Sequence, residues 1–465
     1  MRTIIIGTGR AGVLLARELS RNPNEKIDLA GFVDDKSAEE KPSDLGLAIL
    51  GPINRLPSIL SEHKIQQVIV ALPDARGPLI RRILSGCKGS GAQLRILPFS
   101  EPLKQGLELI SLVRPVAPAD LLERNEAVLS EEDLLKFFQG KTVLITGAAG
   151  SIGSNLAQRV AAYEPERLLL LDQNADSLDA LSANLWKTFP EVPAGLLLMN
   201  IRERGGIEKL MREQRPSVIL HAAGHKHVPM MENQAAEAVK NNVFGTRNIA
   251  DSAFEAGAEA FLLLSTRLAA NPSSVLGATK RIAEYVVRSL HERGKTRFST
   301  VRLCNVLGST ASVAHVFLEQ IRRGDPLTVT HPDMKRFFMS AHEAVSLCLF
   351  ALIHSIGEIC TPDFRDPLKI LDLAEYLITM TGLTIGKDVE IKFTGLRPGE
   401  CLFDDRIADP GETTRKVHKN VLAIDALPLP DNLDDALERL EECAMAGDDA
   451  KCKSIMKEMI PTYEN

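Results

Sequence analysis

The sequence lacks an excess of positive charge. Lysine and arginine together number 55 and aspartate and glutamate 61, which gives a formal net charge of −6. Binding to nucleic acid needs a basic surface that neutralises phosphates. We therefore exclude nucleic acid as the main partner of this chain.

Paired cysteines are also missing. The seven cysteines are scattered along the chain, their number is odd, and no two have the C-x-x-C spacing. A zinc site or a disulfide framework is recognised by paired, regularly spaced cysteines. We expect no metal site, and thiols that are reduced and mostly buried.

Long apolar runs are absent too. No stretch approaches the roughly 18 apolar residues that cross a bilayer. The longest apolar pieces, such as 168–171 and 261–264, are typical of buried parallel strands. The chain begins MRTIIIGTG, a strand that runs straight into a glycine turn, which is not the pattern of a signal peptide. We expect a cytoplasmic protein without a membrane span.

What the sequence does contain is a repeated pattern of apolar run, glycine turn and amphipathic helix. It occurs at RTIIIGTGRAG and again at KTVLITGAAGSIG, and alternating strands and helices follow each copy. Such alternation is typical of a parallel sheet with helical crossovers. The pattern predicts an α/β protein with two Rossmann-like, doubly wound parallel-sheet domains, the second ending in a smaller C-terminal substrate lobe.

A chain of 465 residues is long enough for two or three domains. We predict a nucleotide-binding domain at 1–125, a linker at 126–140, a second domain with its substrate lobe at 141–430, and a polar helical tail at 431–465. The expected strands of the first domain are 2–7, 26–35, 66–73 and 92–98. After the strand that opens the second domain, we expect strands at 167–174, 194–201, 217–224, 260–266 and 298–308.

The first glycine turn has the spacing G-x-G-x-x-G, formed by Gly7, Gly9 and Gly12. Glycines in this position let backbone N–H groups approach a pyrophosphate at the start of a helix. Asp34 or Asp35 lies at the end of the next expected strand, where an acid binds a ribose. A nucleotide site and a structural relic in a regulatory or dimerising domain both remain open for this turn.

The second turn has the spacing G-x-x-G-x-x-G, formed by Gly147, Gly150 and Gly153. Asp172 ends the following strand, 25 positions after Gly147. A carboxylate there accepts hydrogen bonds from the ribose hydroxyls and repels a 2′-phosphate, so it favours NAD over NADP. The other predicted dinucleotide contacts are Ser151, Ile152, Asn200, Ile201, Ala222, Ala223 and Lys280.

Seven further segments occur in a specific order. They are HAAGHKHVPMME (221–232), KNNVFGTRN (240–248), LLST (263–266), NPSSVLGATKR (271–281), RLCNVLGS (302–309), TVTHPDMKRFFM (328–339) and TGLRPGE (394–400). Together the chain resembles the CapD-type nucleotide-sugar 4,6-dehydratases of bacterial polysaccharide biosynthesis, in the extended short-chain dehydrogenase/reductase family. Members usually carry several transmembrane helices before the first domain, and this sequence contains none.

The resemblance implies a redox-neutral reaction on UDP-N-acetylglucosamine. In the family, hydride leaves sugar C4 for NAD⁺, water is eliminated across C5 and C6, and the hydride returns to C6. It also implies a homo-oligomer with a UDP-sugar as its ligand. The implied substrate contacts are Lys226, His227, Asn305, Arg336, Arg397 and Glu400.

The sequence departs from the family where the proton-transfer residues are expected. Family members read S-T-D-K-A after the fifth strand, whereas this chain retains Thr266 but has Arg267 and Leu268 in place of the acid and base. The superfamily's Y-x-x-x-K pair is Leu276 and Lys280 here. Arginine stays protonated and leucine does not titrate, so neither replacement can transfer a proton.

Three functions therefore remain open. The first is a dehydratase-type enzyme whose catalytic site is impaired or altered. The second is a sensor or partner protein that binds NAD and a UDP-sugar without catalysis. The third is a UDP-sugar C4 oxidase or epimerase that uses Thr266 and Lys280 alone.

Overall fold

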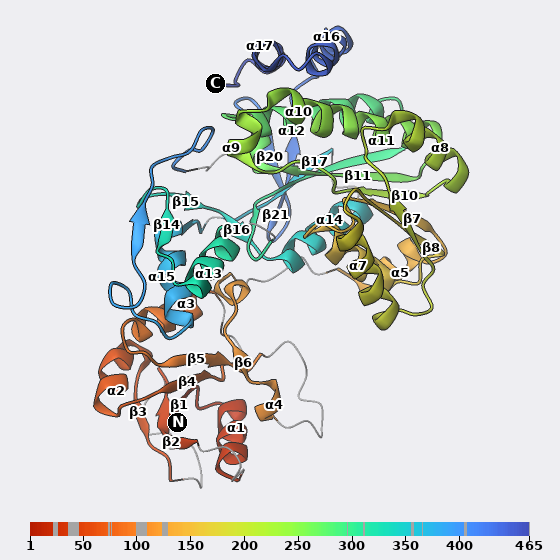
Figure 1. Cartoon of the computed structure of the whole chain (residues 1–465). Coiled ribbons are helices and arrows are strands. Elements are labelled where there is room, and N and C mark those ends of the chain that lie inside the picture. The colour runs from red at the N-terminus through yellow and green to blue at the C-terminus, as the bar shows by residue number, and fades with distance from the viewer. Residues whose placement is uncertain are drawn as a thin grey trace. The chain divides into compact units, whose positions relative to one another are not determined.

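The computed structural model divides the chain into two compact units (Figure 1). The described residues are 1–21, 27–35, 46–72, 75, 77–98, 109–122, 129–294, 296–309, 312–354, 358–364, 366–403 and 407–464. The first unit comprises Met1–Arg124, Ala311–Asp333 and Leu368–Gly395. The second comprises Asn125–Thr310, Met334–Pro367 and Leu396–Asn465.

The first unit is built on a sheet with the strand order β3-β2-β1-β4-β5-β6. Its strands are β1 (Arg2–Ile6), β2 (Asp28–Val33), β3 (Ile49–Gly51), β4 (Gln67–Val70), β5 (Gln93–Ile96) and β6 (Arg114–Pro115). Its crossover helices are α1 (Arg10–Arg21), α2 (Leu56–Glu62), α3 (Gly77–Cys87) and α4 (Leu109–Leu112). β1 pairs in parallel with both β2 and β4, and β5 pairs antiparallel with β6. The predicted parallel, doubly wound fold is confirmed here.

Two segments from the second half of the sequence pack with the first unit. They contain α13 (Val313–Arg323), β14 (Leu327–Val329), α15 (Ile370–Met380) and β19 (Ile391–Phe393), and β14 pairs in parallel with β19. α15 packs on α3, and Lys88 forms an ion pair with Glu375. The sequence places these segments within the predicted range 141–430, whereas they cluster with the first unit in the structure. Periodicity marks the apolar face of a helix and does not indicate which partner that face will meet.

The second unit is built on a longer sheet with the order β20-β21-β17-β12-β11-β10-β7-β8-β9. The strands are β7 (Thr142–Thr146), β8 (Arg167–Asp172), β9 (Ala194–Leu198), β10 (Val218–His221), β11 (Ala260–Thr266), β12 (Arg297–Leu303), β17 (Ile359–Pro362), β20 (Thr413–His418) and β21 (Val421–Asp425). From β9 to β17 neighbouring strands are parallel, and β21 pairs antiparallel with β17 and β20. The strands predicted at 167–174 to 298–308 are all present.

Helices cover both faces of this sheet. They are α6 (Gly153–Ala161), α7 (Ala175–Thr188), α8 (Arg204–Gln214), α9 (Val228–Glu232), α10 (Ala235–Val239), the π-helix η3 (Lys240–Phe244), α11 (Gly245–Glu255), the 3₁₀ turn η4 (Arg267–Ala269), α12 (Val275–His291) and α14 (Ala341–His354). Alternate residues of each strand enter opposite cores: Ile145 lies in one and Leu144 in the other. A strand buried on both faces reads as an unbroken apolar run, which explains sequences such as LLLL at 168–171.

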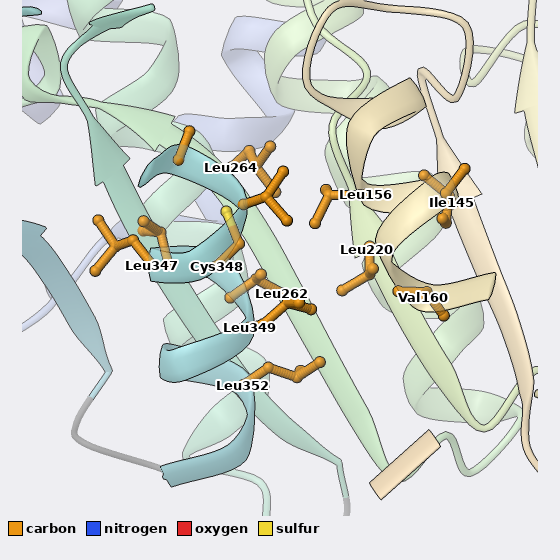
Figure 2. Packing of buried hydrophobic residues seen from close by; sticks show 14 of the residues in the cluster. Ile145, Leu156, Val160, Leu220, Leu262, Leu264, Leu347, Cys348, Leu349 and Leu352 are labelled. Atoms are coloured by element: carbon orange, nitrogen blue, oxygen red, sulfur yellow. The ribbon is translucent and has the colours of Figure 1, made fainter. Parts of the chain in front are cut away.

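Figure 2 shows part of one of these cores, in which α6 and α14 pack on β7, β10 and β11. The labelled side chains include Leu156 and Val160 from α6, Leu349 from α14, and Leu220 and Leu262 from the strands. This packing fixes the position of α6, and therefore of the glycine turn that precedes it.

The predicted linker and tail are both packed parts of the second unit. Of the linker, 126–128 lie outside the described residues, and α5 (Glu131–Phe138) buries Leu134 and Phe138 in the core. The tail forms α16 (Leu433–Met445) and α17 (Asp449–Met459), whose apolar faces pack with α10 and α12. Among the described residues, no helix combines the length and apolarity that crossing a bilayer requires.

Candidate functional site

The glycine turn between β7 and α6 depends on glycine for steric reasons. Gly147 has φ +62°, and a Cβ there would lie 2.7 Å from the backbone N of Ala223. A Cβ on Gly153 would lie 2.1 Å from the carbonyl O of Gly147. The turn therefore brings the start of α6 close to the residues that follow β10, and the positive end of a helix dipole favours an anion there.

Asp172 is fixed at the end of β8 by the turn. Its Oδ2 accepts a hydrogen bond of 3.0 Å from the backbone N–H of Ala149, and its Oδ1 accepts one of 3.0 Å from Asn174. The side chain is only partly buried, so its remaining lone pairs can accept from a ligand. The carboxylate and the glycine turn therefore form one unit, as dinucleotide binding requires.

Asn200 and Ile201 follow β9 at the same end of the sheet. Asn200 donates to Gln173 over 3.0 Å and accepts from the N–H of Arg202 over 3.0 Å. Ile201 is buried, and its side chain approaches Gly245 so closely that a Cβ on that glycine would lie 2.6 Å from Cδ1. Asn200 and Ile201, two of the predicted dinucleotide contacts, thus lie one strand beyond Asp172.

A buried histidine links the turn to the helix layer, and the sequence analysis did not find it. His221 Nδ1 lies 2.7 Å from Oγ1 of Thr146, and Nε2 lies 2.9 Å from Oγ1 of Thr246. Thr246 donates its own proton to the carbonyl of Asn242, so its oxygen accepts from His221 and the proton is assigned to Nε2. Burial, assisted by the charge of Lys280, lowers the pKa of His221 to about 3, so the ring is neutral.

Lys280 of α12 lies beside the end of β10. Its ammonium group donates to the carbonyl of Leu264 over 3.0 Å, and a Cβ on Gly224 would lie 3.0 Å from its Nζ. Burial lowers the pKa of Lys280 to about 8, with Glu284 acting in the opposite direction. Residues 222–224 therefore lie beside both the glycine turn and Lys280.

The substituted catalytic segment begins at the end of β11. Oγ1 of Thr266 accepts from the N–H of Leu268 over 3.3 Å and so caps the short turn η4. Arg267 is buried, its guanidinium lies 4.4 Å from the ring centre of Phe337, and it donates to Sγ of Cys304 over 3.7 Å. Leu276 is buried in the core between α12 and the C-terminal helices. Neither leucine nor the stacked arginine offers a proton-transfer group.

The loop after β10 carries a concentration of basic groups. The N–H of His225 donates to Asn242 over 2.8 Å, and Lys226 and His227 are exposed. Burial lowers the pKa of Lys226; burial and then the charges of Lys226 and Arg397 lower the pKa of His227. A Cβ on Gly399 would lie 3.0 Å from Cγ1 of Val228 and 2.9 Å from Oε2 of Glu232, so TGLRPGE packs against α9, the helix that follows this loop.

Asn305, Arg336 and Arg397 lie on neighbouring parts of the second unit. Asn305 is exposed on β13 (Asn305–Val306), which pairs with β16 (Phe338–Met339), and its N–H donates to the carbonyl of Phe337. Arg336 donates to the carbonyls of Cys401 and Leu402 over 2.7 and 3.1 Å. These bonds fix the chain that follows Glu400.

Arg397 already has a partner within the same loop. It donates to Oε1 of Glu400 from Nε over 3.1 Å and from Nη2 over 2.7 Å, and its backbone N–H donates to Oε2 over 3.0 Å. The Arg397 side chain remains 62% exposed, so the guanidinium can also contact a ligand. Glu400 thus serves in the first place to orient Arg397.

A buried cluster of charges lies behind segment 265–271, and no pattern in the sequence predicts it. Oε1 of Glu284 accepts from Ser265 over 2.6 Å, and Arg302 donates to the same carboxylate over 2.8 Å. Arg281 contacts Glu284, Asp409 and Glu412. Asp409 accepts from the N–H of Asn271. Segment 265–271 is therefore held at both ends by the cluster.

The first unit has a comparable turn. A Cβ on Gly12 would lie 2.0 Å from the carbonyl O of Gly7, and one on Gly7, where φ is +111°, would lie 2.7 Å from Leu72. Among the described residues, a Cβ on Gly9 would meet no atom within 4 Å. Asp34 accepts from both the N–H and the hydroxyl of Thr8, over 2.7 and 2.6 Å.

The geometry brings the predicted dinucleotide residues together. The glycine turn contacts Asp172 on one side and 222–224 on the other, and Lys280 lies beside 224. The predicted substrate residues carry mainly positive charge. In the described ranges no group of His, Cys, Asp or Glu is arranged to hold a metal ion.

Two protein-family models match different parts of the chain. The model of the polysaccharide biosynthesis protein family matches residues 143–426, and that of the CoA-binding domain family matches residues 1–98. The "Probable polysaccharide biosynthesis protein EpsC" of Bacillus subtilis is 37% identical over 406 residues, which cover 87% of this chain and 68% of EpsC. The "Capsular polysaccharide biosynthesis protein CapD" of Staphylococcus aureus is 36% identical over 410 residues, with the same coverage.

More distant relatives include an enzyme named for its reaction. A "UDP-N-acetylglucosamine 4,6-dehydratase (inverting)" of Campylobacter jejuni is 29% identical over 298 residues, 62% of this chain and 83% of that protein. Among solved structures, Pen from Bacillus thuringiensis has a TM-score of 0.57 at 26% identity and covers 63% of this chain and 91% of its own. The dTDP-glucose 4,6-dehydratase DesIV from Streptomyces venezuelae, at a TM-score of 0.50 and 20% identity over 56% of this chain and 86% of its own, shares the fold.

Proposed function

Because this chain belongs to the polysaccharide biosynthesis protein family, we propose that its second unit is a nucleotide-sugar-modifying site of the 4,6-dehydratase type that binds NAD and a UDP-sugar. In this proposal the unit keeps the binding equipment of its relatives, and its proton-transfer residues are altered. Dehydration is therefore expected to be very slow or absent.

The observation that carries the proposal is the position of Asp172. Its carboxylate is tied to the glycine turn by Ala149, at the end of the strand next to the turn. A carboxylate there accepts from both hydroxyls of an adenosine ribose and repels a 2′-phosphate, which favours NAD over NADP. The pyrophosphate would lie at the start of α6, where the helix dipole favours negative charge.

When bound, the nicotinamide supplies hydride acceptance and return. Lys280 would place its charge next to the ribose of that ring, since its Nζ lies beside Gly224 and the end of β10. Thr266 would orient the sugar C4 hydroxyl. Its oxygen already accepts from Leu268, which leaves the hydroxyl proton free to point at a substrate oxygen.

The UDP diphosphate would be held by arginine and the basic loop. Arg397 is pre-oriented by Glu400, and Arg336 holds the following backbone in place. A guanidinium fork suits a diphosphate because it donates two parallel hydrogen bonds. Lys226 and His227 add donors from the facing loop, and Asn305 adds an exposed amide.

Loss of elimination follows from three positions. Arg267 is stacked on Phe337, Leu268 has no titratable group, and Leu276 is buried in an apolar core. Each missing general acid or base typically reduces the rate by about 10²- to 10⁴-fold. The same three positions favour a second candidate, a sensor or partner protein that binds both ligands without turnover. A C4 oxidase or epimerase using Thr266 and Lys280 is the third.

The test is to incubate the purified chain with NAD⁺ and UDP-N-acetylglucosamine and to follow the 4-keto-6-deoxy product. We expect turnover near the detection limit. The double variant Arg267→Asp, Leu268→Lys should raise it, whereas Arg322→Asp, at an exposed position, should not. Fast turnover by the unaltered chain would overturn the proposal of an impaired site.

A redox change of the bound nicotinamide distinguishes the candidates from one another. All three require the chain to bind NADH and UDP. Hydride transfer from a UDP-sugar to NAD⁺, seen as absorbance of the reduced nicotinamide, would favour the oxidase or epimerase. Binding of both ligands without any redox change, also in the double variant, would favour the sensor.

A further inference from the structure

Two cysteines face each other between the last two helices of the second unit. Sγ of Cys443 on α16 and Sγ of Cys452 on α17 lie 3.0 Å apart, and both side chains are buried. The sulfurs of a disulfide are about 2.05 Å apart, so these two need to approach by about 1 Å. We propose that Cys443 and Cys452 form a reversible intrachain disulfide that fastens α16 to α17.

The local structure explains why the two thiols meet. Gly447 follows α16 with φ +74°, a conformation that suits glycine and reverses the chain. The N–H of Asp448 donates to the carbonyl of Cys443 over 3.0 Å, and its side chain accepts from Lys451 over 2.9 Å, which caps α17. These bonds close the turn of the hairpin formed by α16 and α17, and Cys443 and Cys452 lie on the two helices next to that turn.

The hairpin is attached to the helices that surround the candidate site. Asp449 accepts from the N–H of Ala236 on α10 over 2.7 Å, and Lys453 lies 3.0 Å from Oε1 of Glu232 on α9. The other oxygen of Glu232 accepts from the N–H of Val275, the first residue of α12. A disulfide between α16 and α17 would therefore hold Asp449 against α10 and Lys453 against α9. Both α9 and α10 pack on α12, the helix that carries Lys280.

The oxidation needs a two-electron acceptor, and hydrogen peroxide is the oxidant that we name. One thiolate attacks the O–O bond to give a sulfenic acid and hydroxide, which takes up a proton as water. The second thiol then displaces water from the sulfenic sulfur and forms the S–S bond. In sum, two thiols and one peroxide give one disulfide and two waters.

Burial slows both the oxidation of the two thiols and the reduction of their disulfide. Burial, and then the hydrogen bond with Cys443, raises the pKa of the Cys452 thiol, so that it is protonated near neutral pH. The attacking species is the thiolate, which forms only when the hairpin opens. Oxidation of this pair should accordingly be slower than oxidation of exposed thiols. Once formed, the disulfide should resist a brief treatment with reductant.

The test uses the full chain, treated with hydrogen peroxide and then alkylated after denaturation. We expect a species that carries two alkyl groups fewer than the reduced, fully alkylated chain, in which a peptide containing Cys443 is linked to one containing Cys452. Peptide mapping separates this link from one between Cys348 and Cys360, which share another core. Full alkylation of both residues after oxidation, or a link to any other cysteine, would overturn the proposal.

A second readout follows the hairpin itself. Closing a ring of about ten residues should reduce local opening by about a hundredfold, since the opened state loses chain entropy. Hydrogen exchange of the α17 amides should therefore slow after oxidation and recover with dithiothreitol. The variants Cys443→Ala and Cys452→Ala serve as matched controls, and slowing of equal size in either variant would contradict the disulfide.

Discussion

At the scale of single residues, the account depends on a carboxylate whose orientation is set by the backbone. Asp172 accepts from Ala149 in the glycine turn and from Asn174 at the start of α7. The two bonds hold the group in one orientation before a ligand arrives, so no side-chain entropy remains to be lost on binding. A neighbouring acid without these bonds, such as Asp176, provides a control on the same surface.

Replacing Asp172 by alanine should weaken NADH binding by about ten- to a hundredfold, because two ribose hydroxyls lose an ionised acceptor. Binding of NADPH should be affected less, since the repulsion of its 2′-phosphate disappears with the charge. Fluorescence titration of both cofactors measures the change. Asp176→Ala should leave both affinities unaltered, and an equal loss in the two variants would argue against the assigned role.

His221 is the second residue with a measurable consequence. Its folded pKa of about 3 lies below the unfolded value of about 6.5, so the folded state does not take up the proton that the unfolded chain takes up. The stabilisation is complete above pH 6.5 and is lost as the pH falls towards 3. Between pH 6.5 and 5 the loss amounts to about 2 kcal/mol.

The variant His221→Gln should therefore have a flatter pH profile of unfolding free energy. Urea denaturation at several pH values from 7.5 to 5 gives that profile. We expect the unaltered chain to lose about 2 kcal/mol more than the variant over this range. Parallel profiles would mean that His221 is not the group that titrates.

At the scale of elements, a buried charge cluster fixes the distance between α12 and the strands beneath it. Arg302 comes from β12, Arg281 and Glu284 from α12, and Asp409 and Glu412 from the segment before β20. Arg302 and Glu284 are fully buried. Burial raises the pKa of Asp409, while Arg302 and Arg281 outweigh burial and lower that of Glu412.

Removing one charge from this cluster should be costly. Arg302→Met leaves the three buried carboxylates of the cluster facing Arg281 alone, which we expect to reduce the free energy of unfolding by roughly 3–5 kcal/mol. The matched variant Glu358→Gln breaks the pair with Arg288 at the other end of α12. Glu358 is 33% exposed, so the cost there should be at most about 1 kcal/mol. Equal losses in chemical denaturation would refute this difference.

The same scale shows what sequence reasoning could and could not predict. The strands were predictable because strands buried on both faces are continuous apolar runs, as at 168–171 and 261–264. Asp172 was predictable because one helix and one strand separate it from the glycine turn, and their lengths set the number of residues between the two. The charge cluster was not, since Glu284 and Glu412 are far apart in sequence and meet only in the folded unit. Nor does periodicity show that α15 packs on α3.

At the scale of the whole molecule, the chain contains two glycine turns with similar steric requirements. Gly12 and Gly153 each face the carbonyl of the first glycine of their turn, and a Cβ would lie 2.0 and 2.1 Å from it. The two turns differ in the groups that donate hydrogen bonds to the acid at the end of the following strand. In the first unit the hydroxyl of Thr8 already donates to Asp34, whereas the donors to Asp172 among the described residues are the backbone N–H groups of Ala149 and Asn174.

This difference predicts which turn binds the dinucleotide. Gly153→Ala should abolish NADH binding, because the new methyl group displaces either α6 or the turn. Gly12→Ala should disturb the first unit to a similar degree and leave NADH binding intact. Circular dichroism controls for folding, and titration with NADH decides between the turns. Loss of binding in Gly12→Ala alone would transfer the site to the first unit.

The most direct measurement is a calorimetric titration of the unaltered chain with NADH, after any bound nucleotide has been removed. We expect saturable heat with one NADH bound per chain. Titration that releases no heat, together with a crystal soaked in NADH that shows no nucleotide beside Asp172, would contradict it.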